Sequence, residues 1–299
     1  MESVPIIRSA QPADYDALDD FLKKNLIIHR HLDWRQPLDW IGHLPFLVME
    51  KDGVIQSVLI CPSDIEGTYW IRLFAVTFTS PVESIFIALF ARALEEINSI
   101  SKGALIASIA YQLWMKNLLE NNGWKICQEV VQLRWNRKVS GYLLSENPPG
   151  FQIREMVASD IPVVASIDQS CFDKLWQHSE DAIERAFDQA AFSTVAVLHG
   201  RIIGYQISTS LKNHAHIARL AVLPEFQRQH IGQHLIGDVL EHFKRPWTRE
   251  ITVNTQKDNL KSLGLYHKLG FEATNDGFPI YQYPKKETAD ESGFSLKIS

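Results

Sequence analysis

The stretch from Leu220 to Phe243 contains the residues whose types and spacing could do chemistry. Pro224 ends an apolar strand-like run, a polar loop follows, and Gly232 opens a segment whose apolar residues recur at helical spacing. The start of a helix presents unpaired backbone N–H groups and the positive end of the helix dipole, which favour a diphosphate. An ordinary strand-to-helix connection has the same pattern, so the loop needs support from other residues.

Residues downstream of the loop supply that support. The loop reads Val222-x-Pro224-Glu225-Phe226-Gln227 and ends with Ile231-Gly232; Val253-Asn254, Asn259, Gly264-Leu265-Tyr266 and Leu269-Gly270-Phe271 follow. This combination resembles the GCN5-related N-acetyltransferase (GNAT) family, over roughly residues 151–284. The loop and the Leu-Tyr-x-x-Leu-Gly-Phe ending are specific when they occur together at this distance.

The resemblance implies two strands that splay apart, with the pantetheine arm of the cosubstrate acetyl-CoA in the gap. Backbone groups of Leu220, Ala221 and Val222 would bind that arm as an added strand. Asn259 matches a family position whose side chain faces the arm, although a polar residue there can also cap a helix. The residues expected around the diphosphate are Gln227, Arg228, Gln229, His230, Ile231 and Gly232, with Gln233 behind them.

Tyr266 matches the family position of the general acid, whose hydroxyl protonates the departing CoA thiolate. A thiol has an ordinary pKa of about 8.5, so the thiolate leaves more easily with a proton donor in reach. A tyrosine on an amphipathic helix can also simply pack in the core. Tyr266 is therefore the expected catalytic acid, with a core role as the alternative.

The amine that attacks the thioester must be neutral, so a proton acceptor is useful. The family often carries a glutamate on the strand before the loop, and the equivalent residue here is His216, with His214 two positions earlier. An imidazole with an ordinary pKa of about 6.5 can accept a proton at neutral pH. His216 is the expected base; His214, a bound water, or an ordinary cleft histidine without this role are the alternatives.

Two loop residues depart from the family pattern. His230 stands where the family usually has glycine, and Arg228 where it often does. If φ must be positive there, a side chain could obstruct the approach of the backbone to the diphosphate. Arg228 and a protonated His230 could equally add cationic contacts.

The chain also repeats itself at one offset. Gly53 and Gly200 lie 147 positions apart (200 − 53 = 147), and Gly123 with Gly270 and Arg72 with Arg219 have the same separation. Ile7-Arg8 with Asp14 similarly resembles Ile153-Arg154 with Asp160. We therefore expect a tandem duplication: a GNAT-like domain at 1–140, a linker at 141–150, the acetyltransferase domain at 151–284 and a flexible tail at 285–299.

Each half is expected to be α/β (α+β), with a mixed, mostly antiparallel sheet flanked by helices and splayed central strands. In the second half the apolar spacing predicts helices over 160–171, 179–191, 232–243 and 260–269. Strands are predicted over 194–198, 202–208, 215–223 and 251–253. Ser179 is the expected cap of its helix.

The first half has lost the chemistry-bearing residues. At the repeat offset, Ile85 stands for Gly232, Gln112 for Asn259, Leu119 for Tyr266 and Tyr69 for His216. We therefore expect a degenerate, non-catalytic domain that buttresses the second or shapes its substrate entrance. Its unusual aromatic and basic segment, His29 to Arg35, is expected to be a solvated or interdomain loop rather than a metal site.

Composition limits the partners and the location. The net charge of −5 argues against nucleic acid as the main partner, which would select a basic surface. Three scattered cysteines give neither a disulfide framework nor a metal site. With no signal peptide pattern and no apolar run long enough for a bilayer, we expect a cytoplasmic protein without a membrane partner; nothing indicates its oligomeric state.

The function that follows is an acetyl-CoA-dependent N-acetyltransferase that transfers acetyl directly to a primary amine, on a small molecule or a peptide, in a ternary complex. The alternative is a non-catalytic acyl-CoA sensor or protein-interaction module on the same scaffold. Cys171-Phe172 and Trp176 weakly resemble ribosomal-protein N-terminal acetyltransferases. The carboxylates that could tolerate a cationic amine nearby are Asp168, Asp173, Glu180 and Asp181.

Overall fold

The computed structural model describes residues 4–24, 26–136, 149–245 and 247–284. The expected tail at 285–299 and all but the last two residues of the expected linker at 141–150 lie outside these ranges.

The second half contains the helices and strands that its sequence predicts, with boundaries shifted by a few residues, and two further strands, β10 and β15, at its ends. They are β10 (Phe151–Glu155), α4 (Ile161–Cys171), α5 (Glu180–Asp188), β11 (Phe192–Leu198), β12 (Arg201–Leu211), β13 (His214–Val222), α6 (Ile231–Phe243), β14 (Glu250–Gln256), α7 (Leu260–Lys268) and β15 (Phe271–Gln282). Ser179 caps α5 as predicted, because its hydroxyl accepts the Ala182 N–H at 3.1 Å.

The first half follows the same order with additional short strands. Its elements are β1 (Ile6–Ser9), α1 (Tyr15–Leu22), β2 (Leu26–Arg30), β3 (Phe46–Lys51), β4 (Val54–Ile60), β5 (Ser63–Ile65), β6 (Thr68–Trp70), β7 (Leu73–Thr77), α2 (Val82–Ile100), β8 (Leu105–Ile109), α3 (Leu113–Asn121) and β9 (Lys125–Trp135). The strand β13 of the second half corresponds to β6 and β7 together. The mixed α/β architecture with two repeated halves is therefore confirmed.

The repeated Arg and Asp residues make the same ion pair in both halves. Arg8 donates to both carboxylate oxygens of Asp14 at 2.7 and 2.8 Å, and Arg154 does so to Asp160 at 2.7 and 2.9 Å. Each aspartate also accepts a backbone N–H three residues earlier, at the turn that leads into the first helix of its half. The pair thus ties the first strand to the first helix in each repeat.

Five strands of the first half form a sheet with helices on both faces, in the order β1-β3-β4-β7-β2. Side chains alternate across a strand, so neighbouring residues enter different cores. Leu47, Leu59 and Phe74 pack with α2 and α3. Phe46, Val58 and the other residues of the opposite face pack with α1.

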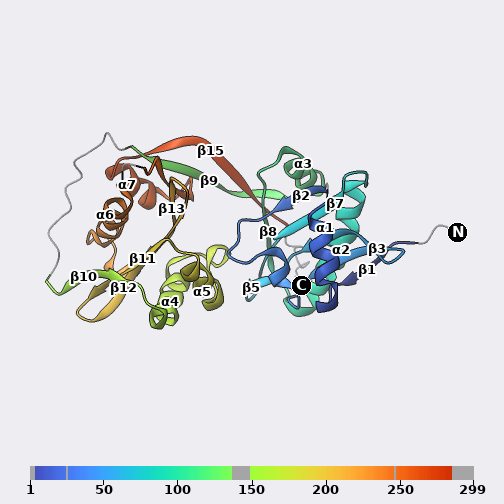
Figure 1. Cartoon of the computed structure of the whole chain (residues 1–299), viewed down its shortest axis with the longest axis horizontal. Coiled ribbons are helices and arrows are strands. Elements are labelled where there is room, and N and C mark those ends of the chain that lie inside the picture. The colour runs from blue at the N-terminus through green and yellow to red at the C-terminus, as the bar shows by residue number, and fades with distance from the viewer. Residues whose placement is uncertain (1–3, 25, 137–148, 246, 285–299) are drawn as a thin grey trace, which may run out of the picture.

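The second sheet contains ten strands and draws them from both halves, in the order β10-β11-β12-β13-β14-β9-β15-β8-β6-β5. The first half's β9 lies between β14 and β15, with Val253 opposite Leu133 and Phe271 opposite Trp135. The far end of β15 in turn lies between β9 and β8, with Ile280 opposite Ile109. Figure 1 shows β9 and β15 running between the two halves of the molecule.

The halves have therefore exchanged their last strands. A division of the sequence between 140 and 151 separates the two repeats, but β9 lies before that division and is hydrogen-bonded into the sheet that lies after it. The exchange also joins the cores, because Leu133 and Trp135 pack with the apolar faces of α6 and α7. None of the described helices is long and apolar enough to cross a membrane.

A substitution in β9 is expected to destabilise the second half although it lies in the first repeat. Leu133 is fully buried in the core that includes Ile236, Val253 and Phe271. We expect Leu133→Ala to lower the free energy of unfolding by about 2–5 kcal/mol, the usual cost of a buried leucine truncation. Chemical denaturation followed by circular dichroism measures this change.

The matched control is Leu211→Ala, because that leucine is 76% exposed. It should change the free energy of unfolding by no more than about 0.5 kcal/mol. Equal effects of the two substitutions would show that β9 does not support the second half's core.

Candidate functional site

Strands β13 and β14 separate part-way along their length. They pair in parallel from His214 opposite Glu250 to Ile217 opposite Val253. Beyond this point β13 stays with β12, where Leu220 lies opposite Gln206, and a bulge at Ala218 marks the divergence. Within the described chain, the edge of β13 toward β14 is thus unpaired over Leu220, Ala221 and Val222, as the splayed arrangement predicts.

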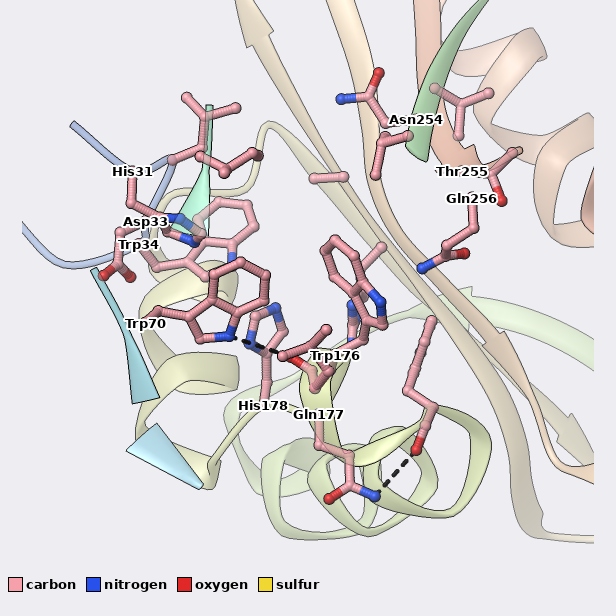
Figure 2. A pocket seen from close by; sticks show the side chains of 18 of the residues that line it. His31, Asp33, Trp34, Trp70, Trp176, Gln177, His178, Asn254, Thr255 and Gln256 are labelled. Carbon is pink, nitrogen blue, oxygen red and sulfur yellow. Dashed lines mark hydrogen bonds between the residues drawn. The ribbon is translucent and has the colours of Figure 1, made fainter. Parts of the chain in front are cut away.

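A cavity of about 380 Å³ opens at this divergence. Its lining includes His216, Leu220, Asn259 and Tyr266, which the sequence places among the expected site residues. The first half also contributes to the walls, and Figure 2 shows His31, Trp34 and Trp70 on one side with Asn254, Thr255 and Gln256 on the other. The structure therefore brings the expected acid and base into one cavity that both halves enclose.

Tyr266 lies in α7, is 5% exposed, and meets Phe271 edge to face with ring centroids 5.5 Å apart. Burial raises the pKa of its hydroxyl above the ordinary value of 10.0. The hydroxyl is therefore protonated at neutral pH, so in a proton transfer it can act only as the donor. Tyr266 packs in the core and also lines the cavity, so its core position is compatible with the expected acid role.

His216 lies in β13, and its Nδ1 is 2.8 Å from the hydroxyl of Thr252. That hydroxyl donates to the carbonyl of Ala215 at 3.4 Å, so it accepts from Nδ1 and leaves Nε2 as the unprotonated nitrogen. Burial lowers the pKa of His216 below 6.5. The imidazole is therefore neutral at pH 7, with one nitrogen able to accept a proton. His214 is exposed instead, and its Nδ1 contacts Glu250 at 2.8 Å.

Asn259 caps α7, because its Oδ1 accepts the backbone N–H of Ser262 at 3.1 Å. The residue also lines the cavity. Capping uses the oxygen of the side chain, so the amide nitrogen of Asn259 is left to donate into the cavity.

The loop before α6 has glycine-like geometry without glycine. Arg228 and His230 both have φ of 63°, in the left-handed region that glycine adopts most easily. Within the described chain no side chain caps α6, whose first amides are therefore available to a ligand. Arg228 and His230, which stand where the family has glycine, thus adopt the backbone conformation that glycine would provide.

Other loop side chains are held within the loop itself. Gln227 donates to the Val222 carbonyl at 3.1 Å, and Gln229 donates to the Glu225 carbonyl at 3.2 Å. The buried Gln233 accepts from His230 Nδ1 at 2.9 Å if that nitrogen is protonated. These bonds order the loop and leave its backbone, rather than its amide side chains, as the expected ligand-binding surface.

Two further residues of this region have packing roles. Ile231 is 1% exposed and joins an apolar core with Leu235 and Ala196. A Cβ on Gly232 would lie 3.1 Å from Cδ2 of Leu265, so this glycine lets α6 approach α7 closely. For Ile231 and Gly232, the groups left to face a diphosphate are therefore their backbone amides.

A buried ion pair that sequence reasoning missed lies beside the cavity. Arg219 donates through Nε and Nη2 to Asp168 at 2.6 and 2.9 Å, and the Tyr205 hydroxyl donates to the same carboxylate at 2.5 Å. Burial alone would raise the pKa of Asp168, but the charge and hydrogen bonds of Arg219 bring it below 3.8. Arg219 also donates to the Trp176 carbonyl, and so fixes one wall of the cavity.

These contacts correct the expectation that Asp168 could accompany a cationic amine, because its charge is already compensated by Arg219. Asp181 is likewise engaged, with Arg35 at 2.5 Å and Arg185 at 2.9 Å. The Arg35 contact and the bond from Gln189 to the Trp34 carbonyl, at 2.7 Å, show that residues 31–35 form an interdomain loop. The expectation of a loop is wrong for His29 and Arg30, which belong to β2, where the His29 side chain is fully buried. The matching of Arg72 with Arg219 in the repeat is the sequence signal for this pair, because each arginine has a carboxylate partner, partly buried Asp33 for Arg72 and buried Asp168 for Arg219.

The first half has filled the groove that is open in the second. Its β2 pairs antiparallel with β7, from Leu26 opposite Thr77 to Arg30 opposite Leu73, on the edge equivalent to the unpaired edge of β13. Gln112, the counterpart of Asn259, donates its side-chain amide to the Ile28 carbonyl of β2 at 3.4 Å. An internal strand thus occupies the place where the second half leaves a gap.

Comparisons with known proteins agree with this geometry. Residues 161–271 match the model of the Acetyltransferase (GNAT) family. The spore coat polysaccharide biosynthesis protein SpsD of Bacillus subtilis (strain 168) is 26% identical over 156 residues, covering 48% of this chain and 54% of that protein. The ribosomal protein bS18-alanine N-acetyltransferase of Escherichia coli (strain K12) is 23% identical over 123 residues, covering 41% of this chain and 82% of the relative.

A solved structure extends the likeness to both halves. The tandem GNAT protein from the clavulanic acid biosynthesis pathway superimposes with a TM-score of 0.58 and 15% identity, covering 94% of this chain and 98% of that one. This likeness concerns the fold, whereas the matched family model concerns the second half. Residues 161–271 are therefore similar to the GNAT family of acetyltransferases, and over nearly its whole length the chain has the fold of a tandem GNAT protein.

Proposed function

We propose that the protein is an acetyl-CoA-dependent N-acetyltransferase whose second half transfers an acetyl group directly to a primary amine. The observation that carries the proposal is the divergence of β13 and β14, which opens onto a cavity lined by His216 and Tyr266. The uncapped start of α6 follows on the same strand-loop-helix segment. The similarity of residues 161–271 to the GNAT family agrees with this chemistry.

The first half supplies an internal argument for where the pantetheine arm binds. There, β2 is an added strand on the edge of β7, and Gln112 donates to its backbone. In the second half the same edge of β13 is unpaired and Asn259 has a spare amide nitrogen. The arm would therefore pair with Leu220 and Ala221 as β2 pairs with β7.

The Val222 carbonyl is a poorer candidate for that pairing. It already accepts from Gln227 at 3.1 Å and from the Cys171 thiol at 3.3 Å. We expect Val222 to contribute through its backbone N–H or its side chain. The diphosphate would lie against the backbone amides of the loop from Gln227 to Gly232. The guanidinium of Arg228, and the imidazole of His230 when it is protonated, would add positive charge.

The roles of the two candidate catalytic side chains follow from their protonation states. Acetyl-CoA supplies an acetyl group activated as a thioester. His216, neutral and with a free Nε2, accepts the proton that the amine loses as its nitrogen bonds to the acetyl carbon, directly or through a water. Tyr266 is protonated at neutral pH and gives its proton to the thiolate sulfur as the carbon–sulfur bond breaks.

The acceptor is not defined by the relatives. One is named for acetylating the alanine of a ribosomal protein, and another for polysaccharide biosynthesis. This chain spans about half the length of the polysaccharide protein. The names of the two relatives are compatible with either an α-amine or an amine on a sugar as the acceptor.

Isothermal titration with acetyl-CoA tests the proposal, and we expect one site per chain because β2 fills the first half's groove. A thiol assay with a panel of primary amines should then show release of CoA. No binding would overturn the proposed function, and binding without CoA release under any amine would favour the sensor alternative. Two equal sites would contradict the assignment of the first half as degenerate.

Tyr266→Phe is expected to lower kcat about 10²- to 10⁴-fold, the usual contribution of a positioned proton donor. The KM for acetyl-CoA should change little, because the ring and its packing against Phe271 remain. Steady-state kinetics measures both values. Tyr15→Phe is the control, since Tyr15 is 51% exposed on the first half, and full turnover by Tyr266→Phe would remove the tyrosine from the mechanism.

The pH dependence of kcat tests His216. Burial lowers its pKa below 6.5, so the neutral base is present throughout the neutral range and is lost only as pH falls through that lowered value. His216→Ala should lower kcat at pH 7 by about 10²-fold, with recovery at high pH where the amine deprotonates in solution.

His214→Ala is the matched control, because that exposed histidine lies two residues away on the same strand. If His214→Ala shows the loss and His216→Ala does not, the base is reassigned to His214. An unchanged profile in both variants would leave water as the proton acceptor.

A further inference from the structure

The part of the cavity beyond His216 is walled by the first half. His31, Trp34 and Trp70 come from that half, and Trp176 from the second half lies beside them. The ring centroids of Trp70 and Trp176 are 5.5 Å apart, and those of His31 and Trp70 are 4.9 Å apart. This end of the cavity is where an acceptor would lie if acetyl-CoA occupies the gap between β13 and β14.

The tryptophans offer their ring faces rather than their N–H groups. Trp70 Nε1 donates to the Leu175 carbonyl at 3.2 Å, and Trp176 Nε1 donates to Gln128 Oε1 at 2.5 Å. Both indoles are thus fixed from behind. Trp70 is 5% exposed and packs behind Trp176, whereas the partly exposed rings of Trp34 and Trp176 leave apolar surface that suits stacking against a ring.

Both carboxylates of this wall already have partners. Asp33 forms an ion pair with Arg72 at 3.3 Å, and each oxygen of Asp64 accepts a hydrogen bond from Ser179, from the hydroxyl at 2.7 Å and from the backbone N–H at 3.2 Å. Burial, first of all, lowers the pKa of His31 well below 6.5 and that of His178 to about 3. Among the described lining residues Asp64 is thus the one carboxylate without a cationic partner, which is fewer than the several amines of a polyamine would need.

The opposite wall carries polar groups with spare hydrogen-bonding capacity. Asn254 Oδ1 is buried and has no hydrogen-bond partner within the described chain. The side chains of Thr209 and Gln256 also line the cavity and make no hydrogen bond to another described residue. Figure 2 shows Asn254 and Gln256 across the cavity from Trp34 and Trp70.

We propose that the acceptor is an amino sugar and that the first half selects it. This assignment rests on the proposed function. A pyranose ring has apolar C–H faces that can stack on Trp34 or Trp176, and a rim of hydroxyls that can bond to Asn254 and Gln256. Its single amine needs no permanent carboxylate partner and can attack the thioester once it is neutral.

The first half is held in place for this role. Its β2 is paired into the five-stranded sheet as far as Arg30, so the next residues, His31 to Trp34, leave the sheet at a fixed point. Gln189 after α5 donates to the Trp34 carbonyl at 2.7 Å, and Arg35 binds Asp181. The strand that fills the first half's groove therefore also positions the acceptor wall.

The test compares D-glucosamine with spermidine and with a peptide that begins with alanine, using release of CoA by the full-length protein. We expect kcat/KM to be at least tenfold higher for D-glucosamine. Trp34→Ala should raise the KM for D-glucosamine about tenfold without changing the KM for acetyl-CoA, because only a stacking face is lost. Trp34→Phe keeps a ring face and should restore most of the affinity.

Trp247→Ala is the matched control, since this tryptophan is 60% exposed in the second half. If the peptide or spermidine is the best acceptor, the N-acetyltransferase function stands and the amino-sugar assignment falls. If acetyl-CoA binds but no amine releases CoA, the proposed function itself fails. An unchanged KM for D-glucosamine in Trp34→Ala, or no rescue by Trp34→Phe, would overturn the role of the first half.

Discussion

The exchange of β9 and β15 is the constraint on which the rest of the molecule depends. Each strand completes the sheet and the core of the other half, so neither half has a full set of backbone partners alone. A sheet edge left open in this way would expose unpaired N–H and C=O groups and apolar side chains. The halves are consequently held in one arrangement, and the cavity between them has fixed walls.

The duplication has produced opposite outcomes from one scaffold. In the second half, β13 diverges from β14 and leaves an open gap. In the first half, β2 pairs with β7 on the equivalent edge and fills that place. Gln112 and Asn259 stand at equivalent helix starts, and only Gln112 has a backbone partner for its amide nitrogen. The strand β2 of the first half therefore occupies the place that is open in the second half.

Electrostatics in the cavity favour neutral chemistry. Arg72 and Arg219, which correspond in the repeat, pair with the partly buried Asp33 and the buried Asp168. Each guanidinium also packs over an aromatic ring, at 5.2 Å from Trp40 and 3.6 Å from Phe172. The surrounding histidines are kept uncharged by burial. An amine bound there would gain little from being protonated. It would therefore stay neutral, and an amine must be neutral to act as a nucleophile.

The sequence by itself determined most helices and strands of the second half, the repeat, and the helix and strand that carry Tyr266 and His216, because these depend on apolar spacing and on motifs within short segments. It could not assign the exchange of β9 and β15, since both strands have the same pattern whichever sheet receives them. Nor could it find that Asp168 is used by Arg219, or that Trp34 and Trp70 face the second half's cavity. Those facts depend on contacts between residues far apart in the chain, and only tertiary packing brings them together.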